Sequence, residues 1–212
     1  MKTEVKLAGL YAITPDWNDT RRLLDVTEAL LAGGCRFLQY RNKQTSDCHR
    51  QEQAVSLRGL TSKYAARLII NDNLDLALFC AADGVHLGED DGHLIAARAR
   101  LDAAGAGKIL GASCYQSLPL ALAAAKAGVD YLAFGSFFAS PTKPQAKRAD
   151  PALIAAAKRE TGLPICAIGG ITLDNASALV AAGADLLAAI TALYDAPDPH
   201  QAALEFSQLF KN

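Results

Sequence analysis

Short apolar segments recur along the chain, and each is followed by a stretch with the apolar spacing of a helix. Eight of these segments are predicted as strands, at residues 9–14, 35–40, 67–70, 84–87, 108–112, 129–134, 164–168 and 185–190. Apolar residues occupy both faces of these strands, as is typical of a parallel sheet covered on both sides. This alternation constrains the fold more than any other feature. It predicts an α/β protein, a single (β/α)8 TIM barrel forming one domain over residues 1–212.

The joints between helices and strands support this count. Similar sequences join a helix to a strand at residues 32–35, 127–130 and 182–185, with a looser version at 81–84. Glycine beyond a helix end adopts the left-handed conformation that turns the chain back toward a parallel strand. The alternative is a doubly wound open sheet. Its usual dinucleotide signature, Gly-x-Gly-x-x-Gly, does not follow the first predicted strand.

Capping residues mark where several helices are expected to begin. Thr20 is a predicted N-cap, and either Ser46 or Asp47 caps the next helix. Asp150 and Pro151 form an N-cap and first-turn pair. A further helix is predicted at residues 175–182, after a pair of glycines.

Composition and charge exclude several classes of protein. The chain is 51% hydrophobic, but no apolar run approaches the roughly 18 residues of a membrane span. The first residues lack the apolar region of a signal peptide, and the five scattered cysteines contain no Cys-x-x-Cys pair. We therefore expect a cytoplasmic protein with reduced cysteines. A net charge of −1 gives no electrostatic case for binding nucleic acid or a membrane.

Polar side chains cluster where the predicted strands end, and in a barrel these ends share one face. Gln39, Arg41 and Lys43 alternate around the end of the second strand, so the two cations are expected to point the same way. A planar guanidinium and a compact ammonium together suit a diphosphate better than a single carboxylate. The alternative is a solvated loop with incidental charges.

Carboxylates follow the next two strands. Asp72 comes after Asn71 at the end of the third strand, and Asp91 follows the fourth, with Glu89 and Asp90 as further candidates. Two carboxylates on one rim near a phosphate site suggest Mg²⁺, which takes one or two carboxylates together with water and phosphate oxygens. The alternative is that Asp72 and Asp91 only cap their helices.

Two loops near the end of the barrel are candidates for a phosphate site. Gly169 and Gly170 follow the seventh strand, permit positive φ and leave backbone N–H groups open to an anion. Thr191, just past the eighth strand, adds a hydroxyl. The loop at residues 140–144 carries hydroxyls, a lysine and two prolines, and it either closes over a ligand or is an ordinary surface loop.

The histidines do not indicate acid-base catalysis. His86 lies within the fourth strand and is expected to be a hydrogen-bonded barrel residue, whereas His49, His93 and His200 fall on predicted helices. No Ser/His/Asp or Cys/His arrangement stands out.

Six short motifs, in order along essentially the whole chain, resemble the thiamine phosphate synthase family. They are Gln39-Tyr40-Arg41-Asn42-Lys43, Asn71-Asp72, the segment 83–88, Gly111-Ala112-Ser113, Thr142-Lys143-Pro144 and the segment 167–171. The resemblance implies condensation of a hydroxymethylpyrimidine diphosphate with a thiazole phosphate, giving thiamine phosphate and diphosphate. These small molecules would be the partners, and the sequence leaves open whether the chain forms a homo-oligomer.

The resemblance also implies roles for individual residues. Catalytic roles fall on Arg41, Lys43, Ser113 and Lys143. Substrate contacts fall on Gln39, Tyr40, Arg41, Asn42, Lys43, Asn71, Ser113, Ser140, Pro141, Thr142, Lys143, Gly169, Gly170, Ile190 and Thr191. Asp72 and Asp91 would hold Mg²⁺, the implied cofactor.

Departures from the family pattern favour the synthase over its relatives. Cys114-Tyr115 stands where Thr-His is common in the family. In the related thiazole tautomerase, proton transfer resembles catalysis by a histidine from this region. An unperturbed tyrosine, with a pKa of about 10, is a poor proton carrier near neutral pH. Glu89, Ser140 and Ile190-Thr191 are conservative departures. A third hypothesis is a barrel that binds a phosphorylated thiazole or thiamine without turnover.

Overall fold

The structure, a computed structural model, describes residues 7–90, 92–139, 145 and 147–211. Eight parallel strands form a closed barrel in chain order, with β8 pairing back onto β1. They are β1 (Gly9–Ile13), β2 (Phe37–Tyr40), β3 (Arg67–Asn71), β4 (Gly84–Leu87), β5 (Ile109–Tyr115), β6 (Tyr131–Phe134), β7 (Ile165–Ile168) and β8 (Leu186–Ala189). The predicted α/β class and (β/α)8 barrel are confirmed.

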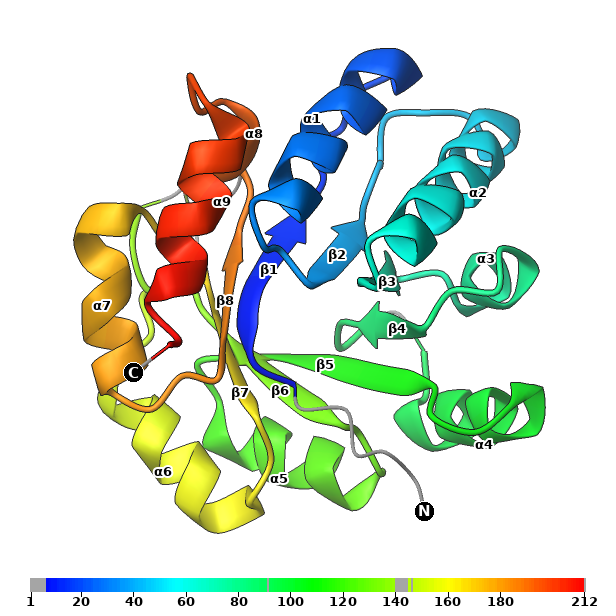
Figure 1. Cartoon of the computed structure of the whole chain (residues 1–212). Coiled ribbons are helices and arrows are strands. Elements are labelled where there is room, and N and C mark those ends of the chain that lie inside the picture. The colour runs from blue at the N-terminus through cyan, green and yellow to red at the C-terminus, as the bar shows by residue number, and fades with distance from the viewer. Residues whose placement is uncertain (1–6, 91, 140–144, 146, 212) are drawn as a thin grey trace.

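Helices lie outside the ring of strands, as Figure 1 shows. They are α1 (Thr20–Ala32), α2 (Asp47–Lys63), α3 (Leu74–Phe79), α4 (Leu94–Ala104), α5 (Leu118–Lys126), α6 (Ala152–Thr161), α7 (Leu173–Ala181), α8 (Thr191–Tyr194) and α9 (Pro199–Gln208). The last helix packs against the first, so the helical layer is continuous where β8 meets β1.

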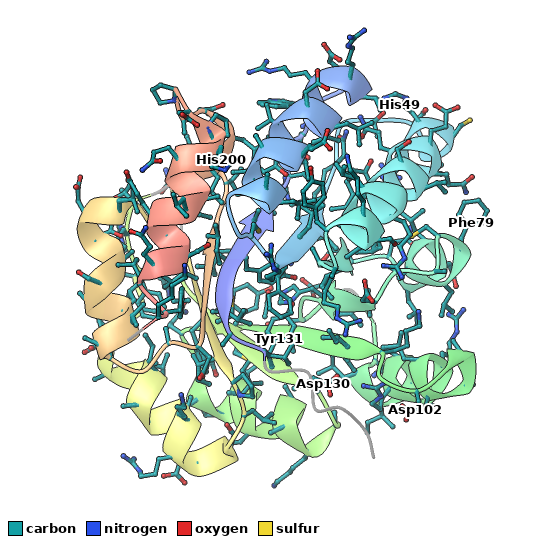
Figure 2. All side chains as sticks on the ribbon, in the orientation of Figure 1. His49, Phe79, Asp102, Asp130, Tyr131 and His200 are labelled. Carbon is teal, nitrogen blue, oxygen red and sulfur yellow. The ribbon has the colours of Figure 1, made fainter. Side chains whose placement is uncertain are left out.

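Alternation along the strands divides the hydrophobic core into two parts, because successive side chains point to opposite faces. On β1, Leu10 and Ala12 pack toward the helices, whereas Tyr11 and Ile13 belong to the barrel interior. Tyr131 of β6 also lies inside the ring of strands, as Figure 2 shows. The interior therefore contains two phenol hydroxyls, and buried hydroxyls require hydrogen-bond partners.

Three aspartates at the amino-terminal end of the barrel give a structural role to three of the four similar joint sequences, those at residues 81–84, 127–130 and 182–185. Each directly precedes an even-numbered strand, accepts a backbone N–H at or near the start of the preceding strand, and pairs with a cation. The accepted N–H groups are Leu68 for Asp83 at 2.8 Å, Leu110 for Asp130 at 2.7 Å and Ile165 for Asp185 at 2.9 Å. The cations are Arg58 and Arg67 for Asp83, Arg98 for Asp130 and Lys158 for Asp185. These carboxylates join neighbouring strands and have a structural role.

The predicted starts of α1 and α7 were wrong by one or two residues. The N-cap of α1 is Asp19 and not Thr20, because the Asp19 carboxylate accepts the N–H of Arg22 at 3.0 Å. Helix α7 begins at Leu173 and not at residue 175. Asn175 lies within its first turn, where the side-chain oxygen accepts the N–H of Thr172 at 3.0 Å.

The structure also defines the starts of α2 and α6 and the end of β5. Ser46, and not Asp47, caps α2. Pro151, and not the predicted Asp150, occupies the N-cap position of α6, although the Asp150 carboxylate accepts the N–H of Ala152 at 2.8 Å. Strand β5 continues past the predicted residue 112 to Tyr115, with a register shift between Ser113 and Tyr115. The single turn α8 was not predicted from the sequence.

All five cysteines are free, as predicted, and four of them are buried. Burial raises the pKa of the Cys35 thiol to about 11 and that of Cys114 to about 12, so these thiols stay protonated and act as packing groups. In the part of the chain that the structure describes, no helix has the length and apolar character to span a membrane.

Candidate active site

A cavity of about 900 Å³ opens at the carboxyl-terminal ends of the strands. Its walls come from several different strands and the loops that follow them. Among its lining residues are Gln39, Arg41, Asn71, His86, Ser113, Gly169, Gly170, Ile190 and Thr191. Residues far apart in the sequence therefore share one cavity, at the face where barrel enzymes place their chemistry.

Arg41 is held at this cavity by the loop that follows β1. Its Nη1 lies 2.8 Å from Oδ2 of Asp16, and its backbone N–H donates to Oγ1 of Thr14 at 2.8 Å. Asp16 also accepts the backbone N–H of Lys43 at 2.7 Å. Asp16 thus fixes both the guanidinium and the chain beyond it, a role that the sequence did not reveal.

Lys43 does not point the same way as Arg41, contrary to the expectation from alternation. Strand β2 ends at Tyr40, so the extended geometry stops before Lys43. The Lys43 ammonium lies 2.9 Å from Oδ2 of Asp72 and lines a second cavity of about 610 Å³. Asn71 lines both cavities and connects them.

Asp72 stands at the rim after β3, with a left-handed backbone at φ 61. Non-glycine residues adopt this conformation rarely, although aspartate and asparagine tolerate it better than most. Its side chain is 24% exposed beside Lys43, so the carboxylate remains accessible to a ligand.

Tyr40 and Asn42 do not line the larger cavity. The Tyr40 hydroxyl donates to Oε1 of Gln53 at 2.8 Å, and Nδ2 of Asn42 donates to the same oxygen at 3.1 Å. Both side chains are buried and border only the smaller cavity. The structure therefore gives them a role in fastening β2 to α2, and burial raises the pKa of Tyr40 so that it remains a neutral hydroxyl.

The loop of Gly169 and Gly170 has positive φ at both glycines, 100 and 64. Glycine is required here for a second reason, because a Cβ on Gly169 would overlap Ser136 and one on Gly170 would overlap Ala139. The loop after β6 thus packs against the glycines, and Ser136 and Ala139 of that loop line the larger cavity with them. Nδ2 of Asn175 donates to the carbonyl of Gly170 at 3.0 Å and holds the loop from α7.

A series of hydrogen-bonded polar groups runs through the barrel interior, and all of them except Tyr131 line the larger cavity. Nε2 of Gln39 donates to the Tyr11 hydroxyl at 2.9 Å, and this hydroxyl lies 2.9 Å from that of Tyr131. Nδ1 of His86 lies 2.8 Å from the Tyr131 hydroxyl, and its Nε2 lies 2.8 Å from Oγ of Ser113. The prediction that His86 is a hydrogen-bonded barrel residue is confirmed.

Several predicted site residues lie outside the described residues. They are Asp91, Ser140, Pro141, Thr142 and Lys143. Among the residues that are described, no three His, Cys, Asp or Glu side chains gather as a metal site. The loop leading to residues 140–144 is anchored, since the N–H of Phe138 donates to the carbonyl of Gly169 at 2.9 Å.

The sequence prediction did not single out Asp16, Tyr11 or Tyr131. A signal for the tyrosines was present, because both occupy inward positions of strands where purely aliphatic residues would be expected. Asp16 gave no comparable signal, since an aspartate after proline is common in turns.

Fold and site together define a class, a (β/α)8 barrel whose cavity at the carboxyl-terminal ends of the strands holds polar side chains and a pair of glycines. Residues 10–193 match the model of a family described as thiamine monophosphate synthase. The thiamine-phosphate synthase of Methylobacillus flagellatus is 56% identical over 204 residues, covering 96% of each chain. That of Thiobacillus denitrificans is 54% identical, covering 95% of this chain and 94% of the relative. The chain belongs to the thiamine monophosphate synthase family.

A solved structure agrees with this assignment. The thiamine phosphate pyrophosphorylase of Pyrococcus furiosus superposes with a TM-score of 0.84 at 33% identity, covering 96% of each chain. The resemblance that the six motifs indicated is confirmed.

Proposed function

We propose that this chain joins a 4-amino-2-methyl-5-hydroxymethylpyrimidine diphosphate to a 4-methyl-5-(2-phosphoethyl)thiazole, giving thiamine phosphate and diphosphate. The observation that carries the proposal is the convergence of Arg41, Asn71, Ser113 and the Gly169-Gly170 loop on one cavity. Family membership supplies the reaction, and relatives more than half identical in sequence bear the name of this synthase.

The proposed division of the site places the pyrimidine diphosphate on the strand-end residues and the thiazole phosphate on the glycine loop. Gln39, Arg41, Lys43, Asn71, Ser113 and Lys143 would contact the first substrate. Ser140, Thr142, Gly170 and Thr191 would contact the second. Both substrates can share the site, because Arg41 and Gly170 line the same cavity.

The main requirement of this reaction is that the negative charge of the leaving group is stabilised. A general base is not required. The carbon–oxygen bond to diphosphate breaks, the pyrimidine methylene becomes cationic, and the thiazole nitrogen supplies the electron pair for the new carbon–nitrogen bond. Arg41 and Lys43 would offset the negative charge of the departing diphosphate. No proton needs to be removed by a side chain in these steps.

The residues present fit Mg²⁺ as the cofactor. Asp72 offers an accessible carboxylate beside Lys43, and Mg²⁺ commonly takes one or two carboxylates with water and phosphate oxygens. We propose Asp72 and Asp91 as its holders. When bound, Mg²⁺ would neutralise charge on the diphosphate oxygens.

The test is to incubate the full chain with both substrates and Mg²⁺ and to measure thiamine phosphate and diphosphate. Stoichiometric formation of both products is the expected result. Conversion of a thiazole phosphate alone would instead indicate a tautomerase, and calorimetric binding with no diphosphate release would indicate a sensor. Omission of Mg²⁺ is the control for the metal requirement.

Two further parts of the proposal concern where and how the chain acts. We propose action in the cytoplasm, supported by five cysteines that are all free. We also propose that residues 1–212 act as one domain on small molecules, supported by strands from both ends of the chain closing one barrel.

A further inference from the structure

Five side chains in the barrel interior form an unbroken hydrogen-bonded series. The proposed reaction uses Gln39 and Ser113 at its two ends but gives no role to the three residues between them. It runs Gln39, Tyr11, Tyr131, His86 and Ser113, from five different strands, with successive distances of 2.9, 2.9, 2.8 and 2.8 Å. The first four have exposed fractions of 4%, 2%, 1% and 7%. Their hydrogens must therefore find acceptors within the series, since a buried donor without an acceptor is costly.

The amide of Gln39 sets the direction of the series. Its Nε2 donates to the Tyr11 hydroxyl, so the single hydrogen of Tyr11 has the Tyr131 oxygen as its acceptor. The hydrogen of Tyr131 then goes to Nδ1 of His86, the second hydrogen-bond partner of this hydroxyl among the described residues. In the opposite direction the Tyr11 hydrogen would face the Gln39 amide N–H and have no acceptor in the series.

The direction fixes the tautomer of His86. Because Nδ1 accepts from Tyr131, the ring hydrogen lies on Nε2, which donates to Oγ of Ser113. Ser113 is then the acceptor in its bond with His86. Its own hydroxyl hydrogen can be donated to a molecule in the cavity that Ser113 lines. Burial raises the pKa of both Tyr11 and Tyr131, so each keeps the hydrogen that the series requires.

We propose that Tyr131 and His86 are positioning residues that fix Ser113 as a hydrogen-bond donor toward the substrate. The atom that Ser113 meets is therefore an acceptor, such as a phosphate oxygen or an unprotonated ring nitrogen. The donor role toward substrate rests on the proposed function, whereas the direction of the series does not.

The first test reads the tautomer without any substrate. The full chain is labelled with ¹⁵N-histidine, and two-bond ¹H–¹⁵N spectra are recorded, with the His86 signals assigned by their loss in His86→Gln. The wild type is expected to show one species with the hydrogen on Nε2. Tyr131→Phe removes the donor to Nδ1 and is expected to give a mixture of both tautomers.

Two variants act as controls for this measurement. Tyr194→Phe removes a buried hydroxyl bonded to Oγ1 of Thr27 at 2.9 Å, outside the series, and should leave His86 unchanged. Ser113→Ala removes the acceptor of Nε2 and should keep the hydrogen on Nε2, because Tyr131 still donates to Nδ1. It also keeps the proposal testable if Tyr131→Phe fails to fold.

The second test is kinetic. Tyr131→Phe should lower kcat about tenfold with little change in KM, the size expected when one buried hydrogen bond is lost. Tyr194→Phe should stay within about twofold of the wild type. A hydrogen on Nδ1 in the wild type, a change of tautomer in Ser113→Ala, or unchanged tautomer and kcat in Tyr131→Phe would overturn the proposal. The spectra remain readable even if the chain does not turn over the proposed substrates.

Discussion

The two ends of the barrel use the same residue types for different purposes. At the amino-terminal end, Asp83, Asp130 and Asp185 each accept a strand N–H and pair with a cation. At the carboxyl-terminal end, Asp72 pairs with Lys43 at 2.9 Å and lines the smaller cavity. A carboxylate whose acceptor capacity serves the backbone contributes stability, whereas one that faces a cavity remains available to a ligand.

Exposure of the carboxylates does not separate the two ends. The Asp83 side chain is 10% exposed, but those of Asp130 and Asp185 are 39% and 25% exposed, against 24% for Asp72. Asp72 has a backbone conformation that costs stability, at φ 61. Ala65 and Ala81, just before β3 and β4, have positive φ as well, so the two ends differ in the partners of their carboxylates and not in exposure or strain.

The largest effect should come from the rim. Asp72→Asn should lower kcat by about 10²- to 10³-fold, because a carboxylate that would hold Mg²⁺ is lost while asparagine still tolerates the left-handed backbone. Mg²⁺-dependent diphosphate release measures the change. Asp130→Asn, at the other end, is the matched control and should keep kcat. Normal turnover by Asp72→Asn would remove Asp72 from the site.

The opposite result is expected at Asp83. Asp83→Ala should lower the free energy of unfolding by roughly 3 kcal/mol, because the Leu68 N–H, Arg58 and Arg67 lose their acceptor. For a chain of this size the corresponding fall in Tm is about 6–12 °C. Thermal unfolding and kcat of the folded fraction are the measurements. A large loss of kcat with unchanged Tm would contradict the structural assignment.

A smaller effect is expected at Gly170. There the strain of a positive φ can be distinguished from the overlap of an added Cβ with neighbouring atoms. Gly170→Ala should raise KM for the thiazole phosphate about tenfold, because a Cβ would overlap the backbone of Ala139 and displace the loop. Gly162→Ala is the matched control, with a similar φ of 69 and nothing near the added Cβ. It should cost only about 1 kcal/mol of stability and leave KM unchanged. Equal effects of both changes on KM would mean that the overlap is irrelevant.

The smallest effect concerns an exposed pair between α1 and α2. Hydrogen bonds from Lys63 and Tyr64 lower the pKa of Glu28 below its ordinary value. The stabilisation is therefore present above the ordinary glutamate pKa and is lost as the pH falls through the lowered one. Glu28→Gln should have a slightly lower Tm than the wild type at neutral pH, and the difference should vanish in acid. A difference that persists below pH of about 3 would show another origin.

Sequence patterns predicted which residues lie at the carboxyl-terminal rim of the barrel. They did not predict which of these residues contact one another. Gln39, Asn71, Asp72 and Ser113 were predicted near strand ends, because strand ends can be read from local apolar runs. The pairing of Lys43 with Asp72 could not be predicted, since it joins loops after two different strands. The expected common direction of Arg41 and Lys43 was wrong because β2 ends at Tyr40.

The sequence by itself determined the alternation of strands and helices, the closing glycines and the family motifs, all of which depend on neighbours within a few residues. Only the tertiary structure decided that Asp16 holds Arg41, that Ser136 and Ala139 pack on the paired glycines, and that Tyr11, Tyr131 and His86 lead to Ser113. Most of these contacts join neighbouring strands or the loops that follow them, and so arise when the strands pair. The Tyr11–Tyr131 contact crosses the barrel and joins residues 120 positions apart, which requires β8 to pair with β1 and close the ring.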